Sequence, residues 1–371
     1  MNIPRVVNGV AARLGTPGWT LLALLAASVG ASAADSPELQ REFIYQDPPP
    51  TPECHASTLC ESTDALVAAW FGGTREKHPD VGIWLSRRPK SGVDSHWGSP
   101  REVFNGAGAG ANGTRVPCWN PVLYQHQGNI LTLYYKVGPS PSTWWGMHSV
   151  STNGGRTWRT PERLPNRHLG PTKNKPIRTD ESFLLFPSST EHDGWKVVFE
   201  RHAPMGGIWY YPDPVKDPAK LQGIQPTVLT LPDGRLVALG RTRRAGQIFR
   251  TVSQDLGVTW TPLSTIPLPN SNTGIDAVTL ADHRHVLVYN HTKSGRSPLN
   301  VAVSSDDATS WSAVHVLESD PGEYSYPAVI QTSDGLVHTT YTWKRQRVRH
   351  VVLDPKKFSP RPIVDGKWPA L

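Results

Sequence analysis

A tight-turn motif that recurs at a spacing of 51 residues is the feature that most constrains the fold of this 371-residue chain. Trp260 and Trp311 end two copies of the motif and are 51 residues apart. Trp158, which ends another copy, precedes Trp260 by twice that interval, and Trp209 stands midway between these two residues. In each copy an Asn or Asp side chain and a small residue reverse the chain, and the Trp packs back over the hairpin. The complete copies are Ser151–Trp158, Ser253–Trp260 and Ser304–Trp311, and Trp97 marks another degenerate one.

A second series of segments, in which a strand, a turn and a second strand follow one another, runs in phase with the first. Each segment opens with a polar residue followed by Pro or Ala, which falls at positions 56, 121, 176, 226, 277 and 327. The last four intervals are 55, 50, 51 and 50 residues. Six such units of four short strands predict an all-β, six-bladed β-propeller, because blades of this kind bury their faces only against neighbouring blades. The alternative is a pair of β-sandwiches with chance spacing.

Residues 1–33 are predicted to be a secretory signal peptide. Arg5 and Arg13 precede an apolar run of 12 residues from Trp19 to Gly30, and Ala31-Ser32-Ala33 resembles a cleavage site. The run is too short to span a bilayer, so cleavage is favoured over an uncleaved membrane anchor. We therefore expect residues 34–371 to form a single exported domain, periplasmic or secreted, with no stable membrane insertion. Its core should extend from about residue 42 to about residue 355, with a strand at 42–45 completing the last blade.

Composition and cysteine spacing exclude several classes of ligand. The chain has 38 Lys and Arg against 31 Asp and Glu, a net charge of +7 that falls to +5 without the two Arg of the leader. This mild excess fits an acidic ligand, but no Lys/Arg stripe of the kind that binds nucleic acid is present. The three Cys have no metal-ligand spacing, so no metal or other cofactor is expected. Cys54 and Cys118 occupy similar places in successive units and could form a disulfide; three buried thiols, including Cys60, are the preferred interpretation.

The polar residues that open the six hairpins are predicted to lie at one level around the central axis. Burial of polar groups without hydrogen-bond partners costs free energy, so such a ring indicates a solvent-accessible functional site at one end of the axis. The ends of the second strands return to the same face and add cations, which can hold an anion, and aromatic rings, which can stack on a sugar. A loop carboxylate, Asp80 or its rival Glu76, could protonate a leaving-group oxygen. The hairpins open with His55, Asn120, Lys175, Gln225, Asp276 and Tyr326, and the second strands end near Tyr135, Lys136, Arg241, Asn290, Trp343 and Arg345.

These motifs resemble the sialidase (neuraminidase) superfamily, which consists of six-bladed propellers with Asp-box turns. The resemblance covers about residues 50–355 and includes the segments His55-Ala-Ser-Thr, Trp70-Phe-Gly-Gly73 and Tyr326-Pro-Ala-Val-Ile330. It implies that Asp80 is the acid/base, that Arg241 and Arg345 belong to a carboxylate-binding arginine triad, and that Tyr324 or Tyr326 is the nucleophilic tyrosine.

Two positions depart from the pattern of the superfamily. His55 stands where the first Arg of the triad is found, and Gln225 stands where a Glu activates the tyrosine. Gln cannot accept a proton, so the Tyr–Glu pair is lost. Asp276, one unit further along the chain, could supply the missing carboxylate.

We therefore predict an exported, monomeric, sialidase-like exo-glycoside hydrolase that removes a terminal acidic or otherwise polar sugar from a glycan. Asp80 would be the general acid/base, and Tyr326, Tyr324 or a water held by Asp276 would attack the anomeric carbon. One alternative is a uronic-acid polysaccharide lyase that uses Arg241, Tyr326 and His55. The other is a carbohydrate-binding propeller without activity. The expected substrate-binding residues are His55, Asn120, Lys136, Lys175, Gln225, Arg241, Asn290, Trp343 and Arg345.

Overall fold

The computed structural model describes residues 1, 36–91, 95–180, 182–204, 207–244 and 246–370. The predicted signal peptide, residues 1–33, lies outside the described residues apart from Met1, so the leader and the domain boundary at residue 34 stay predictions. From residue 36 onward the regular secondary structure of the described chain is almost entirely strand, with short 3-10 helices at Ala111–Gly113 and Pro355–Lys357. None of the described helices has the length and hydropathy needed to cross a bilayer.

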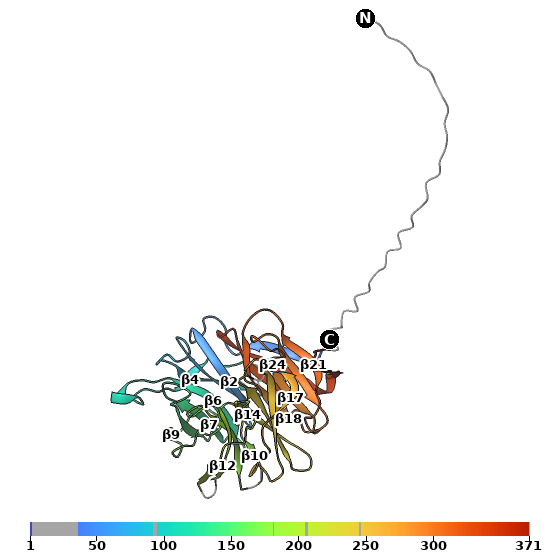
Figure 1. Ribbon diagram of the computed structural model, residues 1–371. Helices are drawn as coiled ribbons and strands as arrows, with labels where there is room; N and C mark the ends of the chain where they lie inside the picture. The colour runs from blue at the N-terminus through green and yellow to red at the C-terminus, as the bar shows by residue number, and fades with distance from the viewer. Residues whose placement is uncertain (2–35, 92–94, 181, 205–206, 245, 371) are drawn as a thin grey trace. The chain divides into compact units, whose positions relative to one another are not determined.

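The strands form six antiparallel sheets, which are the blades of a propeller (Figure 1). The first blade consists of β2 (Glu53–Glu61), β3 (Ala65–Gly73), β4 (Gly82–Pro89) and β5 (Arg101–Phe104). The second consists of β6 (Cys118–Gln125), β7 (Leu131–Val137), β8 (Trp145–Ser151) and β9 (Glu162–Arg163). The third consists of β10 (Ile177–Arg178), β11 (Leu184–Thr190), β12 (Lys196–Ala203) and β13 (Ile208–Tyr210).

The last three blades follow in chain order, and the sixth also contains the N-terminal strand. The fourth blade consists of β14 (Gly223–Thr230), β15 (Leu236–Thr242), β16 (Gln247–Ser253) and β17 (Ser264–Pro269). The fifth consists of β18 (Asp276–Thr279), β19 (His285–Tyr289), β20 (Leu299–Ser304), β21 (Ser312–Glu318) and β25 (Arg361–Pro362). The sixth consists of β22 (Tyr324–Gln331), β23 (Val337–Trp343), β24 (Arg347–Leu353) and β1 (Glu38–Phe43).

The first strand of each blade lies nearest the axis of the ring. Among these inner strands β2 contacts β6 and β22, and β18 contacts β14 and β22. In Figure 1, β2, β6 and β14 lie in the middle of the propeller, while β9 and β12 lie further out. The predicted all-β, six-bladed propeller is confirmed.

The N-terminal strand closes the ring, as predicted. Strand β1 pairs antiparallel with β24, with Glu42 opposite His350. It begins at Glu38, earlier than the predicted strand at 42–45. Arg41 helps to hold it, because its guanidinium donates to Glu38 on the same strand and to the Leu317 carbonyl at the end of β21.

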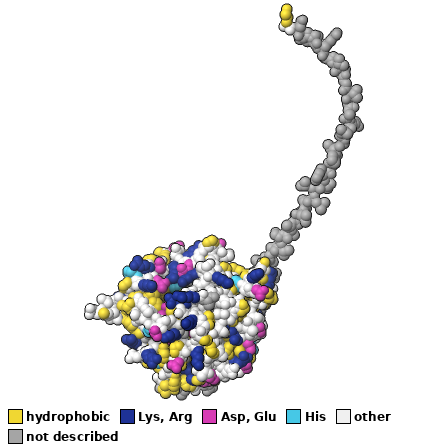
Figure 2. All heavy atoms as spheres, viewed as in Figure 1, with side chains coloured by type: hydrophobic (Ala, Val, Ile, Leu, Met, Phe, Trp, Pro, Cys, Tyr) yellow, Lys and Arg dark blue, Asp and Glu magenta, His cyan; other side chains and the backbone are white. Residues whose placement is uncertain are grey.

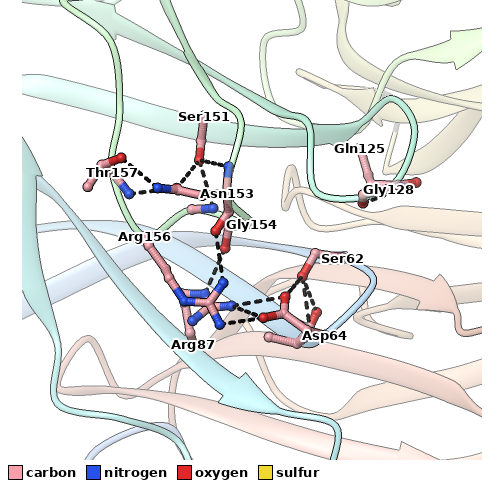
Figure 3. A network of polar contacts seen from close by, with 12 residues as sticks. Ser62, Asp64, Arg87, Gln125, Gly128, Ser151, Asn153, Gly154, Arg156 and Thr157 are labelled. Carbon is pink, nitrogen blue, oxygen red and sulfur yellow. Dashed lines mark hydrogen bonds and ion pairs between the residues drawn. The ribbon is translucent and has the colours of Figure 1, made fainter.

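The predicted turn motifs connect the third and fourth strands of their blades. In the second blade the side chain of Asn153 accepts hydrogen bonds from Ser151 Oγ at 3.0 Å and from the Thr157 amide at 2.9 Å (Figure 3). Asp255 and Asp306 accept the corresponding bonds in the fourth and fifth blades. These are Asp-box turns. Figure 3 also shows Arg87 and Arg156 converging on Asp64, which ties the turn of the second blade to the first blade.

All three cysteines are buried free thiols, so the preferred interpretation is confirmed and the Cys54–Cys118 disulfide does not form. Cys60 and Cys118 belong to the hydrophobic core that includes residues of the first and second blades, whereas Cys54 packs with Tyr45 and Trp70. Tyr45 Oη donates to Cys54 Sγ at 3.2 Å. Burial raises the pKa of Cys54 to about 12, which keeps the thiol protonated at neutral pH.

Four inner strands carry a β-bulge at the same place. Ala56, Asn120, Gln225 and Tyr326 have φ angles of 53°, 37°, 53° and 53°, and the pairing register with the second strand shifts at each of them. Residues other than glycine seldom adopt such angles, and bulges redirect side chains beside active sites. His55 therefore stands one residue before the position that corresponds structurally to Asn120, Gln225 and Tyr326.

Candidate active site

Residues from all six blades surround one cavity of about 460 Å³ at one end of the ring. The second strand of every blade runs toward this end, so the residues that end these strands and the loops that follow meet here. The Asp-box turns, which follow the third strands, lie at the opposite end. The contributions of the six blades include Glu76, Ser140, Glu191, Arg241, Arg296 and Arg345, in chain order.

Three guanidinium groups from consecutive blades line one side of the cavity. Arg296, in the β19–β20 loop, and Arg345, in the β23–β24 turn, share Glu323 Oε1 at 2.6 and 2.5 Å. Arg241, at the end of β15, donates through Nη1 to the Asn272 carbonyl at 3.1 Å, and its Nε has no hydrogen-bond partner in the described part of the chain. Unused guanidinium donors that converge in this way suit a carboxylate, which they can bind bidentately.

Tyr326 lies among these cations on the floor of the cavity. Its ring centroid is 5.6 Å from the Arg241 guanidinium carbon and 5.8 Å from that of Arg296. The amide nitrogen of Gln225 donates to Tyr326 Oη at 3.5 Å, and the buried amide oxygen Gln225 Oε1 has no partner among the described residues. The position that departs from the sialidase pattern therefore contacts the tyrosine directly, as a donor.

His55 packs against Tyr326, with ring centroids 4.2 Å apart. Burial holds the pKa of His55 well below its usual value, and the positive charges of Arg345, Arg296, Arg241 and Lys173 lower it further. The imidazole is therefore neutral at physiological pH and adds no charge to the anion site. Its Nδ1 lies 3.0 Å from Thr342 Oγ1.

Two carboxyl groups, Glu76 and Glu191, line the cavity within the described chain. Glu76 forms a salt bridge of 2.5 Å with Arg345. Glu191, which follows β11 directly, is half-buried. Burial raises its pKa; the nearby Arg241 and Arg243 and a hydrogen bond from Trp195 oppose that rise, and the negative charge of Glu76 adds to it.

The predicted acid Asp80 is placed beside the cavity without lining it. Its carboxylate accepts hydrogen bonds from the amide and the hydroxyl of Thr74 at 3.0 and 2.6 Å, and lies 2.7 Å from His78 Nδ1. Burial raises the pKa, but the contacts with Thr74 and His78 together outweigh burial and bring the pKa below its usual value. Glu76, the rival in the same loop, does reach the cavity.

The wall opposite the arginines is neutral and comes largely from the second blade. Trp119 and Trp144 pack edge to face with centroids 5.9 Å apart, and Asn120 donates to the Thr172 carbonyl at 3.1 Å. The hydroxyls of Ser140 and Ser142 complete this wall. Indole faces and hydroxyl groups of this kind suit the ring and the hydroxyl groups of a sugar.

Two residues of the predicted ring lie below the cavity and pair with each other. Lys175 Nζ is 3.0 Å from both carboxylate oxygens of Asp276. Asp276 also accepts bonds from Thr227 Oγ1 at 2.8 Å and from the Val329 amide at 2.8 Å. Its oxygens are thus occupied by protein donors, and the structure does not bring this carboxylate to Tyr326.

Other predicted residues lie between the blades. Lys136 is fully buried and donates to the Pro171 carbonyl, and Asn290 donates to the carbonyls of Arg296, Pro298 and Tyr324, which fixes the loop that carries Arg296. Trp343 packs on Phe43, and Tyr324 is buried in an apolar cluster. Tyr135 is buried with its ring stacked on Phe104. The bulge at Tyr326 explains why Tyr324 faces elsewhere, since a bulge breaks the alternation of the strand.

Residues 64–339 match the BNR repeat-like domain family. The chain belongs to this family. The resemblance to the sialidase and BNR superfamily that its motifs predicted is therefore confirmed.

Relatives of this BNR repeat-like protein include sialidases. It is 24% identical over 289 residues to a sialidase of Bacteroides fragilis (strain YCH46), covering 67% of this chain and 51% of that protein. The chain thus spans about half the length of that curated relative.

Solved structures show the same fold. A protein of unknown function from Dyadobacter fermentans has a TM-score of 0.69 at 18% identity, with 85% of this chain and 98% of that chain covered. The NanB sialidase of Streptococcus pneumoniae has a TM-score of 0.67 at 13% identity, with 87% and 71% covered.

Sequence reasoning missed several residues of the cavity in this BNR repeat-like protein, among them Arg296, Glu191 and Trp195. A signal for them exists: each lies in the loop after the second strand of its unit, as Arg345 does. Arg296 stands six residues beyond Asn290, where the prediction for the fifth unit stopped. Inclusion of these loops would have found all three.

Proposed function

We propose that this protein is a sialidase-like exo-glycoside hydrolase that removes a terminal carboxylated sugar from a glycan. The observation that carries this proposal is the convergence of Arg241, Arg296 and Arg345 around Tyr326 in one cavity. A cavity of about 460 Å³ suits a ligand of monosaccharide size. The relationship to a sialidase supports the same chemistry.

The filled axis below the cavity supports exo action. Lys173 lies beneath Tyr326, with Nζ 5.9 Å from the ring centroid, and donates to the Ile275 carbonyl at 2.9 Å. The Lys175–Asp276 pair fills the neighbouring space between the third and fifth blades. A glycan therefore enters from one side only, with its terminal sugar at the floor.

In the proposed reaction the arginines bind the carboxylate of the sugar, and a carboxyl group of the surrounding loops protonates the leaving oxygen. Tyr326 then stabilises the positive charge that develops at the anomeric carbon. Since Gln225 cannot accept the phenolic proton, water completes the hydrolysis. Asp276 does not hold that water, because protein donors occupy its oxygens.

A substrate screen with an arginine variant tests the proposal. We expect wild-type protein to hydrolyse an α-linked acidic sugar from a panel of sialosides, rhamnosides and uronic-acid glycans. The Arg241→Gln variant should raise KM for that substrate by about 30-fold or more, because loss of a buried charge-assisted contact costs about 2 kcal/mol or more. Its thermal midpoint should stay near that of wild type, since Arg241 makes one hydrogen bond within the described protein.

Arg235→Gln is the matched control, because Arg235 lies at the opposite end of the same hairpin and pairs with Asp233 and Asp307. Its KM should equal that of wild type. Product that absorbs in the ultraviolet would indicate a lyase, and binding without turnover would indicate a carbohydrate-binding module. Either result would overturn the hydrolase proposal.

Export and a monomeric state are parts of the same proposal. The basis for export is the pattern of residues 1–33. Mass spectrometry of the protein purified from a periplasmic or secreted fraction should find Ala34 at the N-terminus, and light scattering should find one copy.

Figure 2 shows Lys and Arg side chains spread over the visible face with Asp and Glu among them, as a mild positive excess predicts.

A further inference from the structure

The turn between β11 and β12 places a carboxyl group in the cavity that no sequence motif indicates. Glu191 follows the last residue of β11 and lines the cavity together with Trp195 from the same turn and Arg241 from the next blade. The indole of Trp195 contacts two guanidinium groups, those of Arg241 and Arg243, at 5.2 and 5.4 Å from its centroid. The turn is thus held against the anion site.

Other carboxyl groups near the cavity are already bound to protein donors. Glu76 is paired with Arg345 at 2.5 Å, and Glu323 bridges Arg345 and Arg296. Asp80 accepts bonds from the amide and the hydroxyl of Thr74 and lies beside His78. Among the described residues Glu191 is the cavity carboxyl group without a salt bridge.

We propose that Glu191 is the general acid/base of the glycoside hydrolysis, an inference that rests on the proposed function. A general acid must carry a proton in the resting enzyme and must reach the substrate. Glu191 meets the second requirement by its position. Burial and the charge of Glu76 raise its pKa against the effects of Arg241, the Trp195 hydrogen bond and Arg243, which favours the protonated form that the first requirement asks for.

The proposed step begins with Glu191 as the neutral acid. Its proton passes to the glycosidic oxygen while the bond between that oxygen and the anomeric carbon breaks. The bonding pair stays on the departing oxygen, which leaves as an alcohol, and Tyr326 faces the resulting positive charge. Water then bonds to the anomeric carbon and gives a proton to the Glu191 carboxylate, which restores the acid.

Substrates that differ in their leaving group test this role directly. The probes are the methylumbelliferyl glycoside and a disaccharide of the acidic sugar that wild type hydrolyses, beginning with methylumbelliferyl N-acetylneuraminide and sialyllactose. We expect Glu191→Gln to lower kcat/KM for the disaccharide by at least about 100-fold, because general acid catalysis contributes that much. For the methylumbelliferyl glycoside the loss should stay below about tenfold, since a phenol departs without protonation.

Asp193→Asn is the matched control on the same turn. Asp193 pairs with Lys196 and its side chain is 94% exposed, so both substrates should react as with wild type. A purely structural role of Glu191 would lower both rates equally and would overturn the inference. So would a leaving-group dependence in Asp80→Asn together with a Glu191→Gln variant that behaves like wild type. If wild type hydrolyses no glycoside of the panel, the proposed function itself fails.

Discussion

At the scale of single residues, the contact between Gln225 and Tyr326 distinguishes this site from a Tyr–Glu pair. The amide donates to the phenol oxygen at 3.5 Å and, unlike a carboxylate, cannot take the phenolic proton. Gln225 Oε1 is buried and lacks a partner among the described residues, which is unusual for a buried polar atom. Unsatisfied groups of this kind occur at sites that a ligand completes, and a sugar hydroxyl could donate to this oxygen.

Replacement of this amide by a carboxylate should improve turnover. In Gln225→Glu the new carboxylate can accept the phenolic proton, so Tyr326 can attack the anomeric carbon directly. We expect kcat on the acidic glycoside to rise at least about tenfold, a conservative share of what general base catalysis contributes. Steady-state kinetics with wild type, Gln225→Glu and Gln225→Ala measure the effect. A variant that folds with an unchanged or lower kcat would show that Tyr326 does not act as a nucleophile even when a base is present.

Cavity residues with polar or charged side chains were predictable from the sequence where they open or end a repeated hairpin. Asn120, Gln225, Tyr326, Arg241 and Arg345 all line the cavity. Lys175 and Asp276, which occupy the same sequence positions in their units, instead form an ion pair. The repeat fixes where a residue stands along its strand, but the partner across the axis decides whether its charge is free or neutralised.

At the scale of elements, the bulges of the inner strands explain why four residues with unusual backbone angles lie at the same level of the ring. These residues are Ala56, Asn120, Gln225 and Tyr326. A bulge adds one residue to the inner strand, so the side chain at that point leaves the regular alternation. Pro121, Pro226 and Pro327 follow three of these residues, which keeps the bulged residue out of the α region. The Pro spacing predicted the positions, whereas the positive φ angles required the three-dimensional pairing.

The N-terminal strand β1 joins the two ends of the domain, and charged contacts of Glu38 contribute to the stability of this connection. Glu38 accepts from Arg41 Nε at 2.7 Å and lies 2.8 Å from His315 Nε2. Burial raises the pKa of Glu38, but these partners outweigh burial and bring it to about 2. The folded protein therefore holds this carboxylate ionised at pH values where the unfolded chain protonates it. The stabilisation is fully present above pH 4.5 and is lost as the pH falls toward 2.

Glu38→Gln should weaken ring closure in a pH-dependent way. We expect the free energy of unfolding at pH 7 to fall by about 2 kcal/mol, the size of a charge-assisted hydrogen bond. The difference from wild type should disappear near pH 2. Chemical denaturation at pH 7, 4 and 3 measures it, and Glu162→Gln, whose side chain is 79% exposed on β9, should not differ from wild type. A difference that is constant over this range would contradict the electrostatic explanation.

At the scale of the whole molecule, two buried lysines connect blades through backbone carbonyls. Lys136 links the second blade to the Pro171 carbonyl, and Lys173 links the third blade to Ile275 in the fifth and to Pro327 in the sixth. Burial lowers the pKa of each lysine to about 7, although Glu200 and Asp276 act in the opposite direction. Between pH 7 and 10.5 the unfolded chain therefore binds more protons at these positions than the folded protein.

Stability should consequently rise with pH above neutrality. Each lysine can add up to about 1.4 kcal/mol per pH unit to the free energy of unfolding in this window. We expect Lys136→Met to reduce the slope between pH 7.5 and 9 by that amount, because methionine binds no proton in either state. Denaturant unfolding across this range measures the slope. Lys196→Met, at an exposed surface position, should keep the wild-type slope.

The sequence by itself determined the architecture of this protein, because a period of about 51 residues and phased hairpins leave few folds that bury every blade. It also predicted cations at the ends of second strands, and Arg241 and Arg345 among them line the cavity. The tertiary structure alone decided which groups act together. Arg296 and Glu191 stand at unremarkable loop positions, and only the closed ring brings them to the same cavity as Tyr326. Asp276 and Lys175 do not line the cavity for an equally physical reason, because the fold places their opposite charges 3.0 Å apart, where they neutralise each other.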